Sequence, residues 1–359
     1  MSLLVDIIGS REDPHSQARA ARKQPLLLHS MSTFRELFAV VFAHREIETV
    51  VEVGVESGQV SSIYTDLGAS AVHCVDPHPT DELRATLSGN DKLHLVEKRS
   101  PEVLAELPHA QLYVLDGDHN YAVVRAEIGW IMRNVPDAVI AMHDVLWPCA
   151  RRDLYYEPSP LRGEDKHESS SDGPTISHDG LTPAGLVGLG AFTWAEKAGG
   201  ERNGVLTAVE DAIAEEEGDW RFEVVPAVYG FGLLMRADAP GAAKIRKDLK
   251  PYTSSELIAK LENNRVALYT RVLEMQYEAV AHADDADRLA ETIAAQRHEI
   301  AALRGEVEHL RRETDHLRDA NARLEQELRD PLSVREPSFG SAINHLGRAT
   351  AARLRKARQ

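Results

Sequence analysis

Between residues 49 and 237, short apolar runs rich in β-branched residues alternate with segments whose apolar residues recur at helical spacing. This alternation is typical of strand–helix units wound around a central, mostly parallel sheet. It therefore predicts an α/β fold with seven strands. The expected strands are residues 49–55, 71–76, 92–98, 111–117, 137–144, 221–227 and 231–237.

The last two expected strands are separated only by Val228, Tyr229 and Gly230. A connection this short joins antiparallel strands, because a parallel pair needs a long crossover. We therefore expect an antiparallel terminal hairpin on an otherwise parallel sheet. A helix from about Ser32 to Arg45 is expected before the first strand, since a serine or threonine can cap its start.

Composition narrows the class of protein. The 359 residues carry a formal charge of −16 and include two cysteines. Nucleic acid is not an expected partner, because phosphate contacts require a basic face. Cys74 and Cys149 are too few for a disulfide framework or a zinc site. No apolar run is long enough to span a membrane, and the N-terminal sequence is too short and acidic for a signal peptide, so we expect a cytoplasmic protein.

Residues 145–203 interrupt the strand–helix rhythm with a stretch rich in Pro, Gly, Ser and charge. Connections of this length are commonly functional. We interpret the segment as a mobile cover over a substrate, called the lid below, and an inert insertion is the alternative. The sequence does not rank the lid side chains that could touch substrate, which are Arg151, Arg152, Tyr155, Tyr156, His167 and His178.

After Pro251 the chain takes on one long helical pattern, begun by Ser254 or Ser255 and stopped by Pro331. Its apolar residues follow a heptad repeat over residues 252–330. The a positions include Ile258, Val272, Ile293, Ile300 and Val307, and the d positions include Leu261, Leu268, Leu289, Leu303, Leu310, Leu317 and Leu324.

Charges beside this seam favour a parallel pair of helices. Glu299 with Arg304, and likewise two later pairs, occupy g and the following e position, and Asn321 at an a position favours two strands in register. We predict a parallel homodimeric coiled coil, strongest over 289–328. Arg265 and other poor core residues weaken the middle, so a hinge or a folded-back helix is an alternative, as is a single solvated helix.

Residues 331–359 form a basic tail, whose cationic residues near the end are Arg348, Arg353, Arg355, Lys356 and Arg358. A solvated helix end, an acidic partner and an anionic membrane surface are all compatible with these charges.

The segment VEVGVESGQVSSIYTDLG places Glu52, Gly54 and Gly58 where the first strand turns into a helix. A dinucleotide fingerprint, and with it an oxidoreductase, is disfavoured because Glu56 and Gln59 stand where that motif needs glycine. The pattern ExGxxxG instead resembles motif I of class I S-adenosylmethionine-dependent methyltransferases, which have a Rossmann-like sheet.

This resemblance implies roles for five residues. Glu52, Gly54 and Gly58 would surround the amino acid and ribose parts of S-adenosylmethionine. Asp76, at the end of the second strand, can accept hydrogen bonds from both ribose hydroxyls and corresponds to the motif II acid. Ser100, after the third strand, lies where the family often contacts adenine.

The stretches LYVLDGDHNY and AMHD end the fourth and fifth strands. Strand ends of a wound sheet converge on the ligand crevice, so Asp116, His119, His143 and Asp144 can face one small volume. Carboxylates there can bind Mg²⁺, and a neutral histidine is suited to remove a proton from a substrate hydroxyl.

Over roughly residues 34–237, these motifs resemble the family of macrolide-sugar O-methyltransferases and cephalosporin hydroxylase-like proteins, with its DGxHxY and HD or ED signatures. The resemblance implies that Asp116 and Asp144 bind a metal ion and that His119 is the general base. His143 stands where metal-dependent members have Glu. Because imidazole is a poor Mg²⁺ ligand, we expect a Mn²⁺-like ion, a weakly held ion or none at His143.

The sequence therefore predicts a methyltransferase domain over residues 1–240, with the lid at 145–203, followed by the coiled coil and the tail. Its expected reaction is methylation of a hydroxyl on a small molecule or sugar, with metal assistance as an option. The alternative is a catalytically silent scaffold whose coiled coil assembles a biosynthetic complex, and the intact motifs argue against it. The identity of the acceptor does not follow from one sequence.

Overall fold

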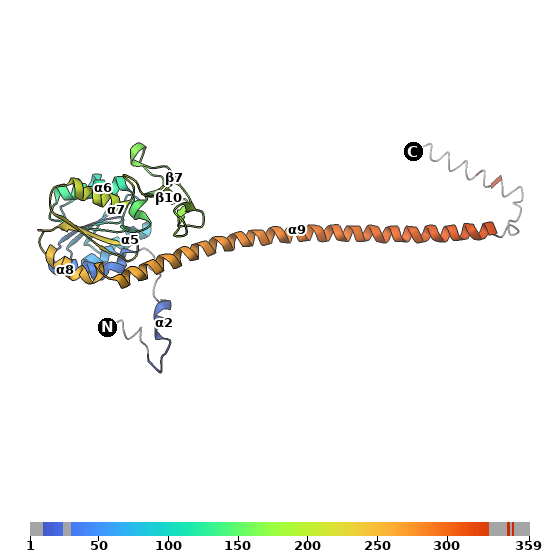
Figure 1. Cartoon of the computed structure of the whole chain (residues 1–359), viewed down its shortest axis with the longest axis horizontal. Helices are drawn as coiled ribbons and strands as arrows, with labels where there is room; N and C mark the ends of the chain where they lie inside the picture. The colour runs from blue at the N-terminus through green and yellow to red at the C-terminus, as the bar shows by residue number, and fades with distance from the viewer. Residues whose placement is uncertain (1–9, 24–29, 330–342, 345–346, 348–359) are drawn as a thin grey trace. The chain divides into compact units, whose positions relative to one another are not determined.

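A computed structural model describes residues 10–23, 30–329, 343–344 and 347. Its centre is a seven-stranded sheet with strand order β11-β12-β5-β4-β1-β2-β3 (Figure 1). The strands are β1 (Thr49–Val53), β2 (Ala71–Val75), β3 (Leu93–Val96), β4 (Leu112–Leu115), β5 (Val139–Met142), β11 (Trp220–Val225) and β12 (Phe231–Arg236). All seven lie where the sequence predicts a strand, so the α/β fold class is confirmed.

Five neighbouring strands of this sheet run parallel, and the last two do not. β11 pairs antiparallel with β12, and β12 pairs antiparallel with β5. The expected terminal hairpin is therefore confirmed. The short turn between its strands has Val228 and Tyr229 in the left-handed region, with φ of 45° and 63°.

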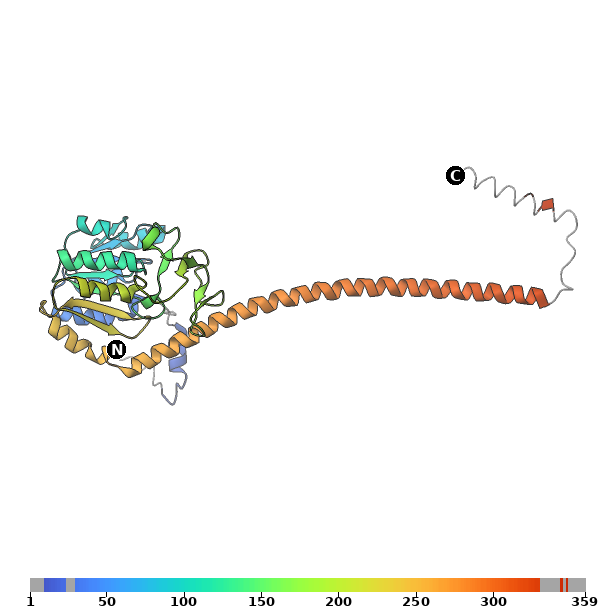
Figure 2. The same cartoon turned by 45° about the horizontal axis from the view of Figure 1, so that its top comes forward.

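Helices cover both faces of the sheet (Figures 1 and 2). Consecutive β1 residues alternate between two cores: Val50 packs with one face's helices and Val51 with the other's. The first face carries the 3₁₀ turn η1 (Met31–Phe34) with α3 (Arg35–His44), α4 (Ser61–Leu67), α5 (Asp81–Ser88) and α8 (Ala242–Thr253). The second carries the 3₁₀ turn η2 (Glu102–Glu106), α6 (Tyr121–Asn134) and α7 (Val205–Glu215).

The helix predicted from Ser32 to Arg45 corresponds to η1 and α3. Two other helices were not anticipated from the sequence, namely α2 (Ser16–Lys23) and α8. α8 packs against α3 and carries Pro251 near its end, so helical structure begins before the long pattern that follows this proline.

The lid has β structure of its own. β6 (Leu154–Tyr156), β10 (Phe192–Ala195) and β7 (Ser169–Ser170) form one small sheet, and β8 (Gly173–Pro174) pairs with β9 (Leu181–Thr182). Buried Asp153 ties the lid to the core: its carboxylate accepts hydrogen bonds from the Tyr121 amide at 2.8 Å and the Gly204 amide at 2.6 Å. The lid is thus anchored to the starts of α6 and α7.

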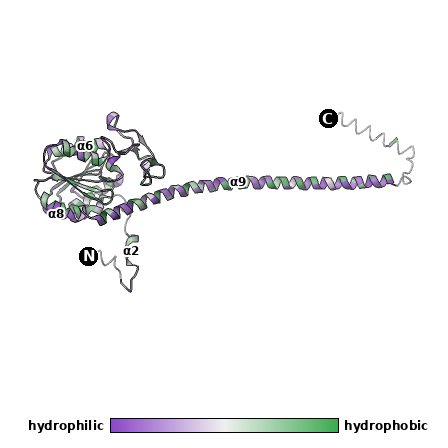
Figure 3. Cartoon of the chain, in the orientation of Figure 1, coloured by the Kyte–Doolittle hydropathy of each residue, from purple (hydrophilic) through white to green (hydrophobic). Residues whose placement is uncertain are grey.

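The long C-terminal helix is α9 (Glu256–Arg329), and Ser255 accepts a hydrogen bond from the amide of Ile258 at its start. The chain divides into two compact units, Met1–Val280 and Ala281–Gln359, so the first turns of α9 belong to the first unit. Along α9, hydrophobic and hydrophilic residues are interspersed (Figure 3). The d residues Leu303 and Leu310 are about half exposed in the single chain.

Within the described residues, no helix combines the length and apolarity that crossing a bilayer requires. Both cysteines are buried free thiols. Pro331 and the basic residues of the tail lie outside the described residues.

Candidate active site

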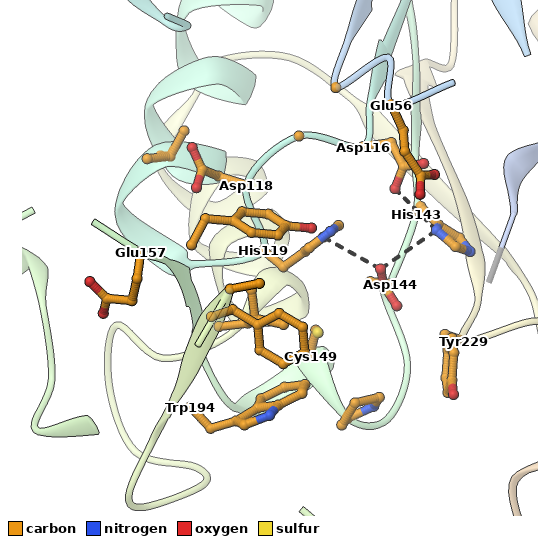
Figure 4. A pocket seen from close by; sticks show the side chains of 18 of the residues that line it. Glu56, Asp116, Asp118, His119, His143, Asp144, Cys149, Glu157, Trp194 and Tyr229 are labelled. Atoms are coloured by element: carbon orange, nitrogen blue, oxygen red, sulfur yellow. Dashed lines mark hydrogen bonds and ion pairs between the residues drawn. The ribbon is translucent and has the colours of Figure 1, made fainter. Parts of the chain in front are cut away.

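A cavity of about 1770 Å³ opens at the carboxyl ends of β1, β2, β4 and β5 (Figure 4). The loops that follow these strands line one part of it, and further lining comes from the loop after β3, the lid and the first turns of α9. This is the position at which wound α/β sheets bind ligands. Of the residues singled out from sequence, Glu52, Gly54, Asp76, Ser100, Asp116, His119, His143 and Asp144 all line this cavity.

The loop after β1 is held from inside the protein. Glu52 is buried and its carboxyl accepts a short hydrogen bond from Ser61 at the start of α4, and burial raises the pKa of Glu52 to about 8. Gly54 has φ of 83°, and a Cβ there would lie 2.3 Å from the carbonyl oxygen of Asp116. The glycine therefore permits β1 and β4 to approach closely at the cavity floor.

Gly58 has φ of 74° and faces side chains of α5, and it is not among the residues that line the cavity. Its left-handed backbone lies in the turn that leads from β1 into α4. Asp76 lies half-buried after β2, and its carboxylate accepts a hydrogen bond from the amide of His78 at 2.8 Å.

Ser100 does not cap a helix. Its hydroxyl donates a short hydrogen bond to Glu127, a buried residue of α6, and burial raises the pKa of Glu127 to about 8. The Ser100 hydroxyl therefore already has a protein partner at the cavity wall. The cap of α6 is Asn120, which accepts a hydrogen bond from the amide of Val123 at 3.0 Å.

Four polar side chains meet at the ends of β4 and β5 (Figure 4). Nδ1 of His143 lies 3.1 Å from Oδ1 of Asp116 and 3.5 Å from Oδ2 of Asp144. Nδ1 of His119 lies 3.4 Å from the same Oδ2 of Asp144. The sequence motifs DGDH and MHD are thus brought into one cluster, as their positions at adjacent strand ends predict.

The second nitrogen of His143 is also engaged. Nε2–H donates to the carbonyl oxygen of Val228 at 2.7 Å, in the turn between β11 and β12. Burial alone would lower the pKa of His143, but Asp144, Asp116 and the Val228 carbonyl raise this pKa to about 10. The ring is therefore held by partners on both sides.

His119 occupies the loop between β4 and α6, where its side chain is 9% exposed. Its backbone carbonyl accepts a hydrogen bond from the Leu154 amide of the lid, and its ring lies 6.0 Å from that of Tyr156. The lid thus packs directly over the histidine. This shields the imidazole from bulk water while leaving it at the cavity wall.

Of the six lid side chains that the sequence left unranked, Tyr156 lines the cavity and the other five do not. Buried Arg152 donates to backbone carbonyls within the lid, Tyr155 donates to Asp153, and Arg151 pairs with Glu210 of α7. These three therefore stabilise the lid.

Sequence reasoning missed the residues that α9 contributes to the cavity wall, which are Tyr269, Leu273, Gln276, Tyr277 and Val280. The signal was present as apolar and aromatic residues outside the a and d positions of the heptad.

Residues 51–145 match a protein family described as a methyltransferase domain. The match runs from β1 to the residue after Asp144 and so includes all four members of the cluster. The recognition of a class I methyltransferase, and of an enzyme, is therefore confirmed for this part of the chain. No curated protein matches the chain.

Solved structures with a similar fold share little sequence with this chain. A protein from Klebsiella pneumoniae described as an O-methyltransferase is 14% identical, with 65% of this chain and 94% of that chain covered and a TM-score of 0.38. A methyltransferase from Geobacter sulfurreducens is 15% identical, with 65% of this chain and 93% of that chain covered and a TM-score of 0.35. A Podospora anserina methyltransferase bound to S-adenosylhomocysteine is 13% identical, with 65% of this chain and 99% of that chain covered and a TM-score of 0.36.

Proposed function

We propose that this methyltransferase uses S-adenosylmethionine to methylate a hydroxyl group of a small molecule or sugar. The observation that carries the proposal is the cluster in which Asp144 faces both His119 and His143 beside Asp116. A base oriented by a carboxylate suits the activation of a hydroxyl, which is a weak nucleophile until it loses its proton.

In this proposal the donor occupies the part of the cavity formed by the loops after β1 and β2. The backbone from Gly54 to Ser57 would face its amino acid portion, and the Asp76 carboxylate would accept hydrogen bonds from its ribose hydroxyls. Glu52 supports the donor site indirectly, because the hydrogen bond that it accepts from Ser61 fixes the loop after β1. Gly58 contributes through the shape of the turn.

Methyl transfer requires the acceptor oxygen, the methyl carbon and the sulfonium sulfur to lie in line. As the oxygen–carbon bond forms, the carbon–sulfur bond breaks and its electron pair returns to sulfur. Nε2 of His119 takes the hydroxyl proton, because Asp144 faces Nδ1 and favours the tautomer with a proton there. The lid excludes water around this step.

The first test of the proposal is cofactor binding. Isothermal titration calorimetry of the purified chain with S-adenosylhomocysteine is expected to give micromolar affinity. Asp76→Ala should weaken the affinity for S-adenosylhomocysteine about tenfold or more, since each lost hydrogen bond to a charged group is worth about 1.5–3 kcal/mol. Asp66→Ala, an exposed position on α4, is the matched control and should bind normally.

NAD is the competing ligand, and it should give no heat in the same titration. Absence of S-adenosylhomocysteine binding at high micromolar concentration would reject the proposed function.

We propose further that Asp116, His143 and Asp144 hold a divalent ion of the Mn²⁺ type. One ligand atom from each lies within 4.8 Å of the others, and Nε2–H of His143 is bonded to a backbone carbonyl, as in many histidine metal ligands. An imidazole nitrogen with two carboxylates suits Mn²⁺ better than Mg²⁺. Such an ion would supply positive charge beside the acceptor oxygen and ease the loss of its proton.

Electron paramagnetic resonance of chelated protein titrated with Mn²⁺ tests this site. We expect one bound ion, lost in Asp116→Asn and retained in Asp165→Asn, which changes a cavity carboxylate that pairs with Arg202. Mn²⁺ that stays free in the presence of the wild-type chain would remove the metal from the proposal.

We propose that residues 252–330 form a parallel homodimeric coiled coil attached to the methyltransferase domain. The support is the row of exposed apolar a and d residues in the second unit, among them Ile300, Leu303, Val307 and Leu310. Burying such side chains against a second copy is worth about 1.5–3 kcal/mol for each residue.

Introducing charge into this seam should separate the dimer. Leu303→Lys with Leu310→Lys is expected to raise the dimer dissociation constant at least about 100-fold, because four buried leucines are lost per dimer. Ala302→Lys adds the same charge outside the seam and should remain dimeric. Sedimentation velocity of the full chain measures this, and a monomeric wild type would contradict the prediction.

A further inference from the structure

The first turns of α9 run along the cavity and are attached to the rest of the domain at two points. Near the reacting cluster, buried Glu262 accepts hydrogen bonds from the amides of Val228 and Tyr229, at 2.9 and 2.8 Å. Arg265 donates to Glu262 at 2.7 Å and lies 4.3 Å above the Tyr229 ring. This end of the helix is thus fastened to the turn whose Val228 carbonyl holds His143.

Three turns further on, α9 is fastened to the lid. The carboxylate of Glu274 accepts a hydrogen bond from the hydroxyl of Ser177 at 2.6 Å and from that of Thr175 at 3.2 Å. Tyr269 and Leu273 lie between the two attachments, and the other cavity-lining residues of α9 follow Glu274 within two turns. This part of the helix is therefore held in place as part of the cavity wall.

The residues that this segment presents to the cavity lie on one helix face. Tyr269, Leu273, Gln276 and Val280 follow one another at intervals of four, three and four residues, which is the repeat of one side of an α-helix. The seam residue Leu268 is not among the cavity-lining residues and is 69% exposed. The helix can therefore line the cavity and pair with a second copy at the same time.

The lid also lines the cavity with apolar residues, namely Leu186, Val187, Leu189, Phe192 and Trp194. Leu189 is 93% exposed, so this part of the lid surface is open to solvent in the single chain. Tyr156 continues this surface toward His119.

Charge along the cavity is strongly one-sided. Among the described residues that line it, Arg99, after β3, is the one lysine or arginine. Carboxylates are more numerous, among them Asp118 beside the cluster, and the lid carboxylates Glu157 and Asp165 are paired with Lys166 and Arg202. A phosphate-bearing acceptor such as a nucleotide sugar would face more carboxylates than cationic side chains along this cavity.

The volume adds a further constraint. Pockets for single small ligands usually measure about 300–1,000 Å³, and this cavity holds about 1770 Å³. It has room for an acceptor larger than one sugar ring beside the donor.

We infer that residues 269–280 of α9, with the lid, bind the body of the acceptor and select a bulky, uncharged, largely apolar hydroxyl compound. The inference rests on the proposed function, because it assigns the acceptor half of the same cavity. It makes Leu273 and Tyr277 specificity-determining residues that lie outside the segment matched by the methyltransferase family.

A matched pair of fluorescent probes tests the class of acceptor. 4-Methylumbelliferyl glucoside is uncharged and carries hydroxyls, whereas 4-methylumbelliferyl phosphate has the same aromatic body with an anionic group. Fluorescence anisotropy with the full chain saturated with S-adenosylhomocysteine should give at least tenfold tighter binding of the glucoside. Equal binding, tighter binding of the phosphate, or no binding of the glucoside would overturn the inference.

Variants of α9 test whether its cavity-lining residues bind the acceptor. Leu273→Ala with Tyr277→Ala should weaken glucoside binding at least tenfold, and Leu268→Ala, on the seam face, should leave it unchanged. S-adenosylhomocysteine affinity and melting temperature should stay at wild-type values in both. Equal effects of the two variants would overturn the role of α9. Loss of S-adenosylhomocysteine binding by the wild type would instead overturn the proposed function.

Discussion

Replacing His119 by alanine is expected to lower kcat about 10²- to 10⁴-fold while cofactor affinity stays unchanged. This is the usual contribution of a positioned general base to proton transfer. The histidine is nearly buried beneath the lid and faces Asp144, so an alanine there leaves, among the residues that the structure describes, no other imidazole beside Asp144 except that of His143. The measurement is single-turnover methyl transfer to an accepted hydroxyl compound, with calorimetry of S-adenosylhomocysteine alongside.

Two further variants separate a base from a structural residue. His167→Ala removes a lid histidine that contacts the Arg202 carbonyl and lies outside the cavity, and it should retain nearly full activity. Asp144→Asn should lower kcat by a similar order as His119→Ala and change its pH profile, because the tautomer of His119 is no longer specified. A His119→Ala enzyme with wild-type kcat would remove the base assignment.

The sheet could be predicted from the sequence because its signals are local. Each strand is a short apolar run, and consecutive residues such as Val50 and Val51 are both apolar because helices cover both faces. The cluster followed from the same topology: residues after adjacent parallel strands must meet at one edge. Asp116, His143 and Asp144 lie in contact for this reason.

What the sequence could not reveal depends on partners distant in the chain. The Ser100 hydroxyl is bonded to Glu127, and Gly58 faces α5, and neither partner is signalled near those residues. The contribution of α9 to the cavity wall was not predicted for a different reason. A sustained heptad accounts for the residues at a and d, and it gives no information on why Tyr269 and Leu273 stand on another face of the same helix.

Gly54→Ala is expected to destabilise the domain by about 3 kcal/mol or more and to reduce activity further. The added Cβ would lie 2.3 Å from the carbonyl oxygen of Asp116, a backbone atom that cannot move without shifting the end of β4. Overpacking costs about 1–3 kcal/mol, and a left-handed alanine costs about 1–2 kcal/mol more. Any relaxation displaces Asp116 from His143, so the cluster is disturbed even where the fold survives.

Gly68→Ala provides the matched comparison, because Gly68 also has a positive φ, of 122°, but a Cβ there meets nothing within 4 Å. The Gly68→Ala variant should lose about 1–2 kcal/mol of unfolding free energy, which is the cost of a side chain at positive φ. It should keep normal activity well below its melting temperature. Urea unfolding and methyl-transfer rates measure the two effects separately. Equal destabilisation of both variants with full activity in Gly54→Ala would mean that the contact between β1 and Asp116 does not shape the reacting cluster.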